Sequence, residues 1–369
     1  MKDRIYVCHT FYHVYITCIK ELLRKQDNTL STKAAIVLSR ISTDFGDLKI
    51  RLENSQLFSE VLIYDEKSED FFPGLKKYRA SGNNIIKNMI NRIIFTKKLG
   101  KAQIPFLPTD FRAYRDIYVF CDSDPIGYYL NYARIPYHAI EDGLNCLVLF
   151  DAAHYDNRGY FRFKAWMSAR NFIFIQNGYG KYCLDMEVND ISILKKTAPN
   201  YIEQSRENMT ARLSDTSKEV LVEIFIANIE SLKQKINEGD NAKRKVLILT
   251  EKLCSAEARE KLFKRIINKY GKINNEEALI IIKPHPMDNL DYQNLFPEHI
   301  VLDGKFPMEI LNLFPGLFFD LVVSIFTVPS GIKFAGEIVN LGQNFVNDEN
   351  DKSLLIDRLS RYAEEILKG

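Results

Sequence analysis

Short apolar runs alternate with amphipathic segments along most of the chain. Runs rich in Val, Ile and Tyr, of the kind that form buried parallel strands, lie at 5–8, 34–39, 60–65, 116–122 and 137–142. Between the first two runs, apolar residues recur at helical spacing over 11–25, and that segment ends in basic residues. A strand, a helix and another strand at this rhythm predict an open, doubly wound α/β sheet.

A second series of the same kind starts near residue 244. Its strands are predicted at 244–250, 277–286, 299–304, 319–327 and 336–344. Amphipathic spacing predicts a helix over 255–271, closed by Gly271, and a further helix over 307–314. The series therefore predicts a second parallel sheet in the C-terminal half.

The stretch between the two series predicts a long helix followed by a polar connector, over 216–245. We therefore place the domain boundary near 240. The sequence predicts an N-terminal Rossmann-like domain at 1–240, a C-terminal Rossmann-like domain at 241–350, and a terminal helix at 351–369 that packs back on the first.

Two Rossmann-like halves with a central cleft form the GT-B architecture, which is common among enzymes that transfer sugars. A fold does not fix a function, but ligands of such sheets bind beyond the carboxyl ends of the strands. Polar residues stand at most of these ends, and they are our candidates for binding and catalysis: His9, Thr10, Glu141, Asp142, Gly143, Thr250, Glu251, Lys283, His285, Ser324 and Thr327.

The composition is that of an ordinary globular protein, and its charge balance bears on whether the protein binds nucleic acid. The 369 residues include 50 basic and 48 acidic side chains, for a net charge of +2. This balance gives no sign of nucleic-acid binding. The stretch 91–101 is locally cationic. It is either a solvated face or a contact with a membrane surface or an anionic acceptor.

Cysteine usage and hydropathy favour a cytoplasmic protein. The six cysteines form no CxxC pair, a pattern typical of reduced thiols in a chain of this length. We expect no signal peptide, because the N-terminus lacks an apolar core segment. No run reaches the ~18 apolar residues that span a bilayer. A membrane role would therefore be peripheral, at the inner face of the cell membrane.

The second half supplies the parts of a nucleotide-phosphate pocket. In "IIIKPHP" (280–286) the prolines end the strand, so Lys283 and His285 leave it from a rigid exit. Lysine suits a phosphate, and histidine can donate a proton to one. Glu309 could accept two ribose hydroxyls, and Ser324 with Thr327 could contact an anion. The structural alternatives are a surface loop, a carboxylate placed by a helix dipole, and ordinary N-caps.

The segment "EDG" (141–143) could supply the base that an acceptor hydroxyl needs. Two adjacent carboxylates raise the pKa of one of them, toward the range in which a base works. Gly143 allows a close approach to the backbone. An acidic turn between a strand and a helix is the structural alternative.

Taken together, these motifs resemble bacterial sialyltransferases of glycosyltransferase family 52, with relatives among the polysialyltransferases of family 38. The resemblance rests on the opening strand and helix, on "EDG" (141–143), on "HP" (285–286), on "SIFT" (324–327) and on "FPMEIL" (306–311). It covers nearly the whole chain. The Ser/Thr motif departs from a paired-serine pattern, because Val328 and Pro329 follow Thr327.

The resemblance implies an inverting, metal-independent transfer of sialic acid from CMP-sialic acid to a glycan hydroxyl, with no cofactor. It implies that Glu141 is the base and that His285 acts on the donor phosphate. Glu251 is the rival base, because family 52 enzymes have also been assigned a carboxylate after the first strand of the nucleotide domain. The resemblance is compatible with a homodimer.

Other interpretations compete with this one. Asp122 and Asp124 in "CDSDP" mimic the DxD motif of metal-dependent transferases. Cys8, His9, His13 and Cys18 could bind zinc, although packing explains them better. Another GT-B nucleotide-sugar glycosyltransferase, or a CDP-polyol phosphotransferase of wall or capsule synthesis, could use the same pocket. A non-catalytic glycan- or nucleotide-binding protein could keep the same scaffold.

Overall fold

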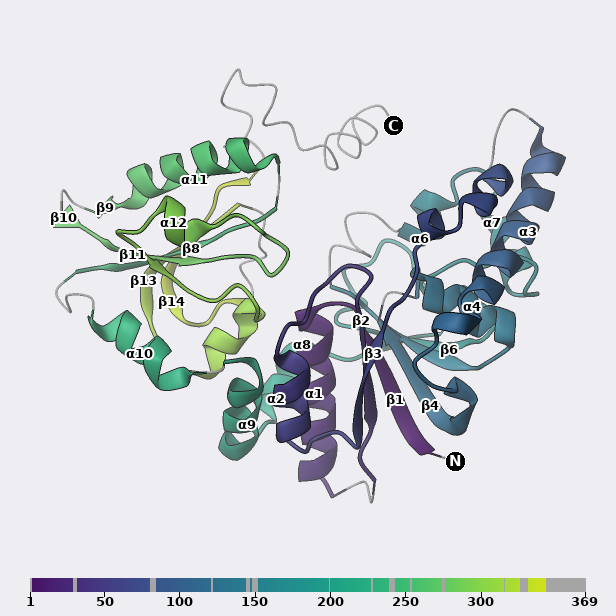
Figure 1. Ribbon diagram of the computed structural model, residues 1–369, viewed down its shortest axis with the longest axis horizontal. Helices are drawn as coiled ribbons and strands as arrows, with labels where there is room; N and C mark the ends of the chain where they lie inside the picture. The colour runs from purple at the N-terminus through teal and green to yellow at the C-terminus, as the bar shows by residue number, and fades with distance from the viewer. Residues whose placement is uncertain are drawn as a thin grey trace. The chain divides into compact units, whose positions relative to one another are not determined.

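The chain divides into two compact units, Met1–Ser217 and Lys218–Gly369 (Figure 1). The sequence places this boundary further along, near 240. The computed structural model describes residues 2–28, 32–79, 84–120, 122–143, 147, 152–198, 200–226, 228–238, 243–252, 254–273, 276–314, 316–325 and 331–342. The helix predicted at 351–369 lies outside them.

A seven-stranded parallel sheet forms the centre of the first unit, in the order β3-β2-β1-β4-β5-β6-β7. Its strands are β1 (Lys2–Cys8), β2 (Ala35–Ser39), β3 (Glu60–Tyr64), β4 (Tyr114–Phe120), β5 (Tyr137–Ile140), β6 (Cys183–Val188) and β7 (Tyr201–Glu203). Val7 pairs with Val37 on one side and with Val119 on the other. The order 3-2-1-4-5-6 is that of the Rossmann fold, in which ligands bind where the strand order reverses, here at β1 and β4.

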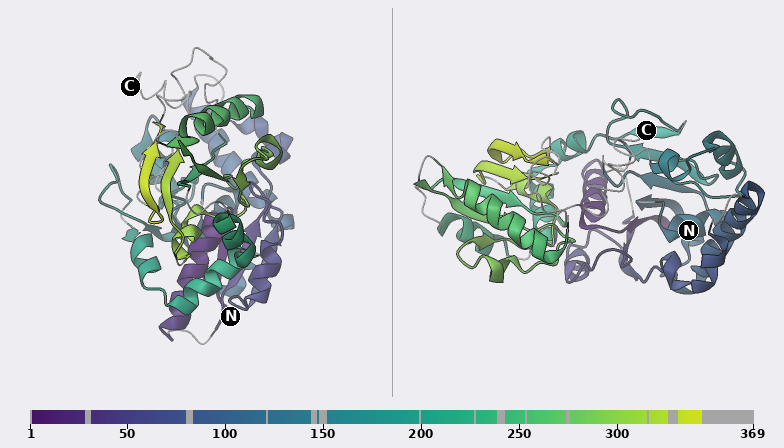
Figure 2. Two further views of the ribbon diagram at one scale, coloured as in Figure 1. Left: turned by 90° about the vertical axis from the view of Figure 1, so that its left-hand side faces the viewer. Right: turned by 90° about the horizontal axis from the view of Figure 1, so that it is seen from above.

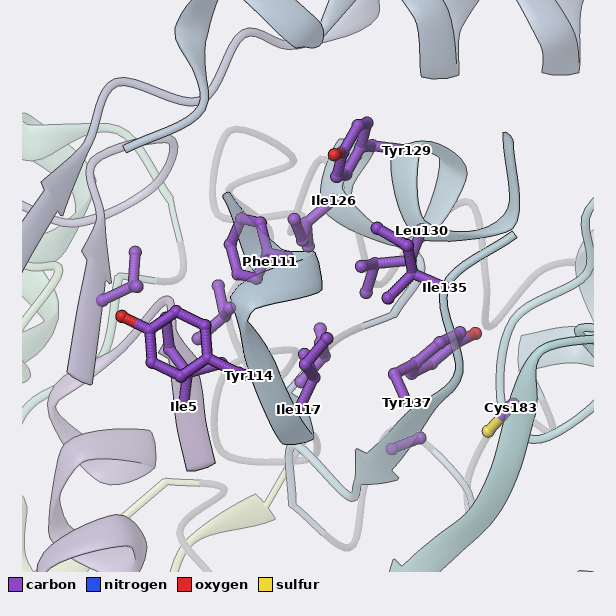
Figure 3. Packing of buried hydrophobic residues seen from close by; sticks show 14 of the residues in the cluster. Ile5, Phe111, Tyr114, Ile117, Ile126, Tyr129, Leu130, Ile135, Tyr137 and Cys183 are labelled. Carbon is purple, nitrogen blue, oxygen red and sulfur yellow. The ribbon is translucent and has the colours of Figure 1, made fainter. Parts of the chain in front are cut away.

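Helices cover both faces of this sheet. The α-helices of the first unit are α1 (Phe11–Gln26), α2 (Leu48–Asn54), α3 (Ile85–Ala102), α4 (Pro125–Ala133), α6 (Ala152–Asp156), α7 (Phe161–Ser168) and α8 (Arg206–Ala211). Alternate side chains of a strand face opposite ways. Ile5 and Val7 therefore pack with Ile126 and Leu130 of α4 in one apolar cluster (Figure 3).

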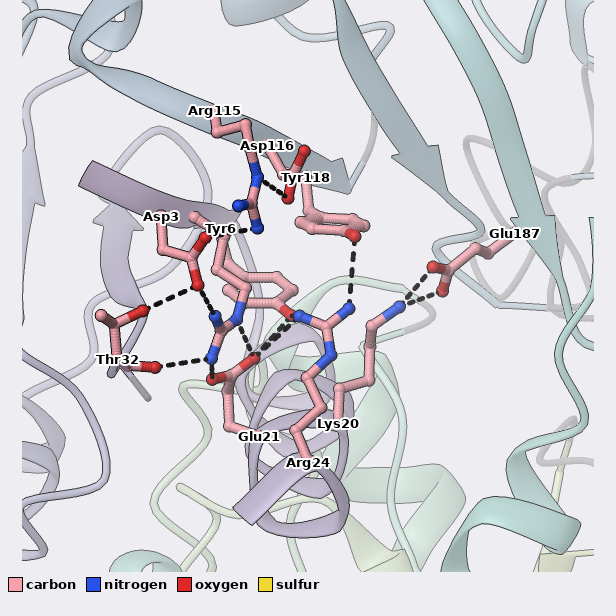
Figure 4. A network of polar contacts seen from close by, with 11 residues as sticks. Asp3, Tyr6, Lys20, Glu21, Arg24, Thr32, Arg115, Asp116, Tyr118 and Glu187 are labelled. Atoms are coloured by element: carbon pink, nitrogen blue, oxygen red, sulfur yellow. Dashed lines mark hydrogen bonds and ion pairs between the residues drawn. The ribbon is translucent and has the colours of Figure 1, made fainter. Parts of the chain in front are cut away.

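The other face of β1 is polar although it is buried. Arg4 is 2% exposed and donates from Nε and Nη2 to the carboxylate of Glu21 on α1, at 2.9 and 2.6 Å (Figure 4). The hydroxyl of Tyr6 donates to the same carboxylate at 2.8 Å, and its ring stacks on Tyr118 with centroids 4.8 Å apart. A hydrogen-bonded ion pair therefore fixes α1 against the sheet.

Two local features position the helices near the sheet edge. Helix α1 begins at Thr10, whose hydroxyl accepts the backbone N–H of His13 at 3.2 Å. Helix α3 packs closely on α4 because a Cβ at Gly100 would lie 2.5 Å from the carbonyl oxygen of Tyr128. Glycine is thus the residue that fits at position 100.

The second unit contains a five-stranded parallel sheet in the order β12-β11-β8-β13-β14. Its strands are β8 (Lys245–Leu249), β11 (Leu279–Lys283), β12 (Ile300–Val301), β13 (Phe319–Ser324) and β14 (Ala335–Asn340). Helix α11 (Ala256–Tyr270) begins at Ser255, whose hydroxyl accepts the N–H of Ala258, and its apolar side lies on the sheet (Figure 2). The predicted α/β class with two Rossmann-like, GT-B-type parallel sheets is confirmed.

The structure also differs from the sequence prediction in individual elements. The single helix predicted from 216 is two helices, α9 (Asp215–Phe225) and α10 (Ile229–Glu238), because Asn228 accepts the N–H of Ser231 and starts a new helix. The helix predicted at 307–314 is a 3₁₀ segment, η5 (Met308–Leu313), which follows Pro307. Strands β6 and β7 were not predicted, because their short stretches contain acidic residues.

Candidate active site

The carboxyl ends of β1, β4 and β5 bring the candidate residues of the first unit to one edge of the sheet. His9 follows β1, Asp124 precedes α4 just after β4, and Glu141 and Asp142 follow β5. These three strands are neighbours and run parallel. His9 and the "EDG" segment therefore lie at the same edge of this sheet.

His13 is the side chain that orients Asp142. The backbone N–H of His9 donates to Nδ1 of His13 at 3.0 Å, so the ring proton lies on Nε2, which donates to the Asp142 carboxylate. The ring of His13 is fully buried and stacks on Phe120 with centroids 4.4 Å apart. Burial lowers the pKa of His13, against the opposing charge of Asp142. His13 is therefore a neutral donor with one fixed tautomer.

His9 lies between two carboxylates. Its Nε2 is 2.9 Å from Oε2 of Glu66 and 3.5 Å from Oδ2 of Asp124. Burial opposes charge on this imidazole, but the carboxylates of Asp124 and Glu66 outweigh it and raise the pKa of His9 to about 9. Ser39 and the N–H of Ile126 also donate to Glu66, each at 2.6 Å. These carboxylates favour the imidazolium form of His9 at neutral pH, although its buried Nδ1 has no hydrogen-bond partner among the described residues.

Asp124 is the partner of His9 that solvent can reach, with 32% of its side chain exposed. Its environment holds its pKa at about 6: desolvation raises it most, His9 lowers it, and the neighbouring carboxylates raise it. A proton can therefore move on and off this edge of the sheet near physiological pH.

Glu141 and Asp142 point to different surroundings. Glu141 is 3% exposed, and its Oε2 accepts the N–H of Asn189, after β6, at 2.7 Å. Burial raises the pKa of Glu141 although that hydrogen bond lowers it. The Asp142 side chain is 37% exposed. The first carboxylate is thus shielded with a raised pKa, and the second meets solvent and His13.

The remaining candidates of this unit have local conformational roles. Gly143 has φ of +133°, a backbone conformation that side chains with a Cβ rarely adopt, and no atom lies within 4 Å of the position of a Cβ there. The glycine is thus required by the turn and not by close packing. Thr10 caps α1 through its hydroxyl.

In the second unit, Thr250 and His285 meet at the carboxyl ends of β8 and β11. The hydroxyl of Thr250 accepts the backbone N–H of His285 at 3.1 Å. Nδ1 of His285 accepts the N–H of Met287 at 3.1 Å, so the ring proton lies on Nε2. The residue is exposed. Desolvation by its surroundings, and then the charge of Lys283, lower the pKa of His285. The ring is therefore neutral, with its N–H donor at Nε2.

Asp288 holds this histidine loop in place, and sequence reasoning missed it. Its carboxylate accepts from the hydroxyls of Thr250 and Tyr292 at 3.1 and 2.7 Å, and it pairs with Arg259 at 2.7 Å. The side chain of Asp288 is fully buried. The network ties the end of β8, the histidine loop and α11 together, which fixes the position of the His285 backbone.

The ammonium group of Lys283 hydrogen-bonds to backbone carbonyl oxygens. Nζ donates to the carbonyl oxygens of Pro284 and Gly304 at 2.8 and 3.1 Å, and lies 4.1 Å from the ring centroid of Phe306. The residue is 3% exposed, and burial lowers its pKa to about 7 against the charges of Asp303 and Glu309. Lys283 thus braces the exit of β11, and its predicted contact with a phosphate stays a prediction.

The other donor-side candidates lie at or near the same sheet edge. Glu309 stands in η5, where burial raises its pKa while its own backbone N–H and Lys283 lower it. Ser324 ends β13 and is 1% exposed. Glu251 directly follows Thr250 and is half-buried. Thr327 lies outside the described residues.

The residues of the two metal-binding alternatives have other partners. The carboxylate of Asp122 accepts from the hydroxyl of Tyr137 at 3.1 Å and from the N–H of Asn177 at 2.9 Å. Cys18 is fully buried in α1. Among the described residues, no group of three or more His, Cys, Asp and Glu side chains is arranged to hold a metal ion.

Sequence reasoning missed Glu66 and considered His13 only as a packing residue or a possible zinc ligand. Glu66 stands two residues beyond the end of β3. A search for polar residues that continued past the end of this strand would have found it. His13 lies inside a helix, one turn after His9, and no local pattern marks it. Its partner Asp142 is 129 residues away along the chain.

The strand order and the parallel sheets define a GT-B-type fold, with polar residues at the carboxyl ends of its strands. The sequence matches glycosyltransferase family 52 over residues 78–335, and the chain belongs to that family. It is therefore a glycosyltransferase, with a nucleotide-sugar donor and a glycan acceptor. The matched range includes Glu141, His285, Glu309 and Ser324, whereas His9, His13 and Glu66 precede it.

Individual relatives are distant. A protein of Haemophilus influenzae described as uncharacterized is 24% identical over 275 residues, which cover 72% of this chain and 80% of that protein. The α/β-galactoside α-2,3-sialyltransferase of Photobacterium phosphoreum aligns with a TM-score of 0.52 at 13% identity, over 96% of this chain and 94% of that one. The GT-B domain of the Photobacterium damselae sialyltransferase aligns with a TM-score of 0.51 at 13% identity, over 90% and 89%. These structures share the fold.

Proposed function

We propose that the protein is an inverting sialyltransferase that moves sialic acid from CMP-sialic acid to a hydroxyl of a galactose-ended glycan without a metal ion. The observation that carries the proposal is the state of His285, an exposed residue that holds its proton on Nε2 just beyond the carboxyl end of β11. The likeness to the two sialyltransferase folds supports the choice of sugar.

On the donor side, the task is to neutralise charge that develops on the phosphate of CMP. The neutral Nε2–H of His285 donates a hydrogen bond to a phosphate oxygen, and keeps its proton, as the bond from sialic acid C2 to that phosphate breaks. Preorganised donors lower such a barrier because they need no reorganisation during the reaction. Lys283, Thr250, Ser324 and Thr327 are the further phosphate-side residues of the proposal, and Glu309 takes the ribose hydroxyls.

On the acceptor side, a carboxylate removes the hydroxyl proton as oxygen attacks C2 from the face opposite CMP. That single displacement inverts the configuration at C2. We assign the base to Glu141, because burial raises its pKa toward the working range of a base. Asp142, held by His13, orients the acceptor together with His9 and the Gly143 turn. Glu251 is the rival base.

We also propose a cellular setting for this reaction. The enzyme works in the cytoplasm, at the inner face of the cell membrane, on lipooligosaccharide or capsular polysaccharide, and it forms a homodimer. The cysteines at 8, 18, 183 and 254 are free thiols, which supports a reducing compartment. Within the described ranges, no helix has the length and apolar character needed to cross a membrane.

A donor screen tests the proposal. The protein is incubated with lactose and with CMP-sialic acid, CDP-glycerol or UDP-galactose, with and without EDTA, and the nucleotide released is measured. We expect CMP release and sialyllactose formation that EDTA leaves unchanged. Turnover of CDP-glycerol alone would identify a polyol-phosphate transferase, EDTA-sensitive turnover of UDP-galactose would favour the DxD interpretation, and CMP binding without turnover would favour a non-catalytic protein.

A further inference from the structure

Helices α3 and α7 of the first unit carry large apolar side chains on the outside of the protein. They lie side by side (Figure 1): Met89 and Ile93 of α3 pack against Met167 of α7 in one small cluster. Lys97 also donates to the carbonyl oxygen of Asn171, just beyond α7, at 2.5 Å. The two helices therefore present a joint outer surface, here called the α3–α7 surface.

The apolar part of this surface is large and aromatic. At the start of α3, Ile86 is 74% exposed, with Ile85 and Ile90 also exposed. On and near α7, the exposed side chains are Tyr160, Phe163, Trp166 and Phe172. Phe163 and Trp166 stack with ring centroids 5.7 Å apart, so they form one stacked aromatic pair and not two isolated side chains. Single exposed apolar residues are common, but clusters mark interaction sites.

Every charge on the two segments that form the surface is positive. Residues 84–103 and 157–172 contain no Asp and no Glu. Their basic residues are Lys87, Arg92, Lys97, Lys98, Lys101, Arg158, Arg162, Lys164 and Arg170. The guanidinium of Arg170 lies 4.0 Å from the ring centroid of Trp166, which places a cation directly at the stacked aromatic pair. Burying so many like charges against another protein would be unfavourable, whereas an anionic surface attracts them.

We propose that the α3–α7 surface docks on an anionic lipid bilayer. Ile, Phe and Trp side chains enter the interface between headgroups and acyl chains, where Trp is favoured, and the surrounding Lys and Arg contact the headgroup phosphates. Helix α3 packs on α4, which starts at Asp124 beside His9. The docked surface thus lies one helix away from the acceptor end of the sheet. This inference rests on the proposed function only for its purpose, which is to hold the enzyme beside membrane-linked acceptors.

Vesicle sedimentation tests the docking directly. The full chain is mixed with phosphatidylglycerol vesicles or with phosphatidylcholine vesicles in 0.1 M NaCl. We expect binding to phosphatidylglycerol that falls when NaCl is raised to 0.5 M, because salt screens the headgroup attraction. Lys87→Gln, Arg162→Gln and Arg170→Gln together should weaken binding by about a hundredfold, at about fivefold for each charge near the membrane. The double variant Ile86→Ser and Trp166→Ser should weaken it at least tenfold.

Matched controls separate the surface from general effects. Ile50→Ser with Leu184→Ser removes apolar groups of similar exposure elsewhere on the same unit, at 58% and 55%. Lys25→Gln, Lys33→Gln and Arg40→Gln remove three exposed charges outside the surface. Both controls should bind vesicles like the unchanged protein. Transfer to soluble lactose should be the same in all four variants, because none touches the candidate active site.

Three results would overturn the proposal. They are no binding to phosphatidylglycerol vesicles, equal losses in the control variants, and a concentration-dependent dimer in sedimentation velocity that Ile86→Ser with Trp166→Ser abolishes. The last result would assign the surface to a second copy of the chain. Vesicle binding needs no catalysis, so a protein that binds vesicles but transfers no sialic acid would uphold the docking and reject the proposed function.

Discussion

Nε2 of His13 donates its proton to the carboxylate of Asp142, across 129 residues of sequence. The direction of this hydrogen bond is fixed, because Nδ1 of the same ring accepts the backbone N–H of His9. Stacking on Phe120 and complete burial leave the ring no other orientation. The exposed carboxylate at the end of β5 is therefore oriented by a helix that starts at the end of β1.

This relationship predicts that His13 is a positioning residue for the transfer reaction. The amide of His13→Gln can still donate to Asp142, whereas the shorter His13→Asn keeps only an acceptor for the N–H of His9. We expect His13→Asn to lower kcat by roughly tenfold to a hundredfold, the range of a misplaced reacting group. His13→Gln should recover most of the loss. Steady-state kinetics with separate kcat and KM measure both.

His138→Asn is the matched control, because His138 forms a partly buried pair with Asp185, which lies on β6 and has no place in the candidate active site. It should leave kcat within about twofold. Equal activity of His13→Asn and His13→Gln, or an effect on KM alone, would contradict a positioning role and leave His13 as a packing residue.

The two assignments of the base predict opposite results for Glu141 and Glu251. If Glu141 is the base, Glu141→Gln should lower kcat by about 10²–10⁴, the usual contribution of general base catalysis, and should leave CMP binding unchanged. Glu251→Gln should then cost less than tenfold. Rapid-quench measurement of the first turnover isolates the chemical step. A normal first turnover in Glu141→Gln together with a slow one in Glu251→Gln would reverse the assignment, and a slow one only in Asp142→Asn would move it to Asp142.

His285→Asn tests the donor side. Asparagine can still accept the N–H of Met287, so the loop keeps its shape, but the proton on Nε2 is gone. We expect kcat to fall by about 10²–10³, the effect of removing one preorganised donor. His299→Asn, a change to another histidine of the same unit, is the control. An unchanged kcat in His285→Asn would remove this histidine from the mechanism.

The sequence was sufficient to predict which candidate residues stand at the ends of strands. Runs of apolar residues are local patterns, so strand ends can be located without the fold. In the parallel sheets of the structure, the carboxyl ends of neighbouring strands lie at one edge. His9, Glu141, Thr250 and His285 were found in this way, and each lies at such an end.

The sequence could not predict which way these side chains point. Glu141 turns to Asn189 because β6 pairs with β5, and β6 was not predicted. Lys283 turns to the carbonyl oxygen of Gly304, which belongs to a loop twenty-one residues further along. These partners are set by tertiary packing, and single-sequence patterns contain no record of such distant contacts.

The charge of His9 predicts a pH dependence of stability. In an unfolded chain a histidine titrates near ~6.5, whereas His9 in the folded protein has a pKa of about 9, raised by Asp124, Glu66 and Asp142 against the effect of burial. Between these values the folded state holds a proton that the unfolded state has lost. The contribution of His9 is therefore complete below about pH 6.5 and lost as the pH rises through 9, and it amounts to about 3 kcal/mol.

His9→Gln removes this titration but keeps a donor for Glu66. Urea unfolding at intervals from pH 6 to pH 10 should show that the free energy of unfolding of the unchanged protein falls more steeply than that of the variant. The two curves should approach each other above pH 9. Parallel curves over the whole range would mean that His9 is neutral in the folded protein.

The buried pair of Arg4 and Glu21 predicts a large and partner-specific loss of stability. Arg4 and Glu21 are 2% and 4% exposed, and Glu21→Gln removes the buried carboxylate that accepts two hydrogen bonds from Arg4, which then keeps its ion pair with Asp3. We expect Glu21→Gln to lower the free energy of unfolding by about 3 kcal/mol, the lower end of the range for a broken buried pair, because Asp3 still pairs with Arg4. The charge pair Lys49 and Glu53 on the exposed side of α2 is the control, and Glu53→Gln should cost less than about 1 kcal/mol.

The double variant Arg4→Met with Glu21→Leu carries neither charge of the pair, so urea unfolding should show it to be more stable than Glu21→Gln. A double variant that is less stable than Glu21→Gln would show that the pair itself, and not the avoidance of an unpaired charge, holds α1 on the sheet.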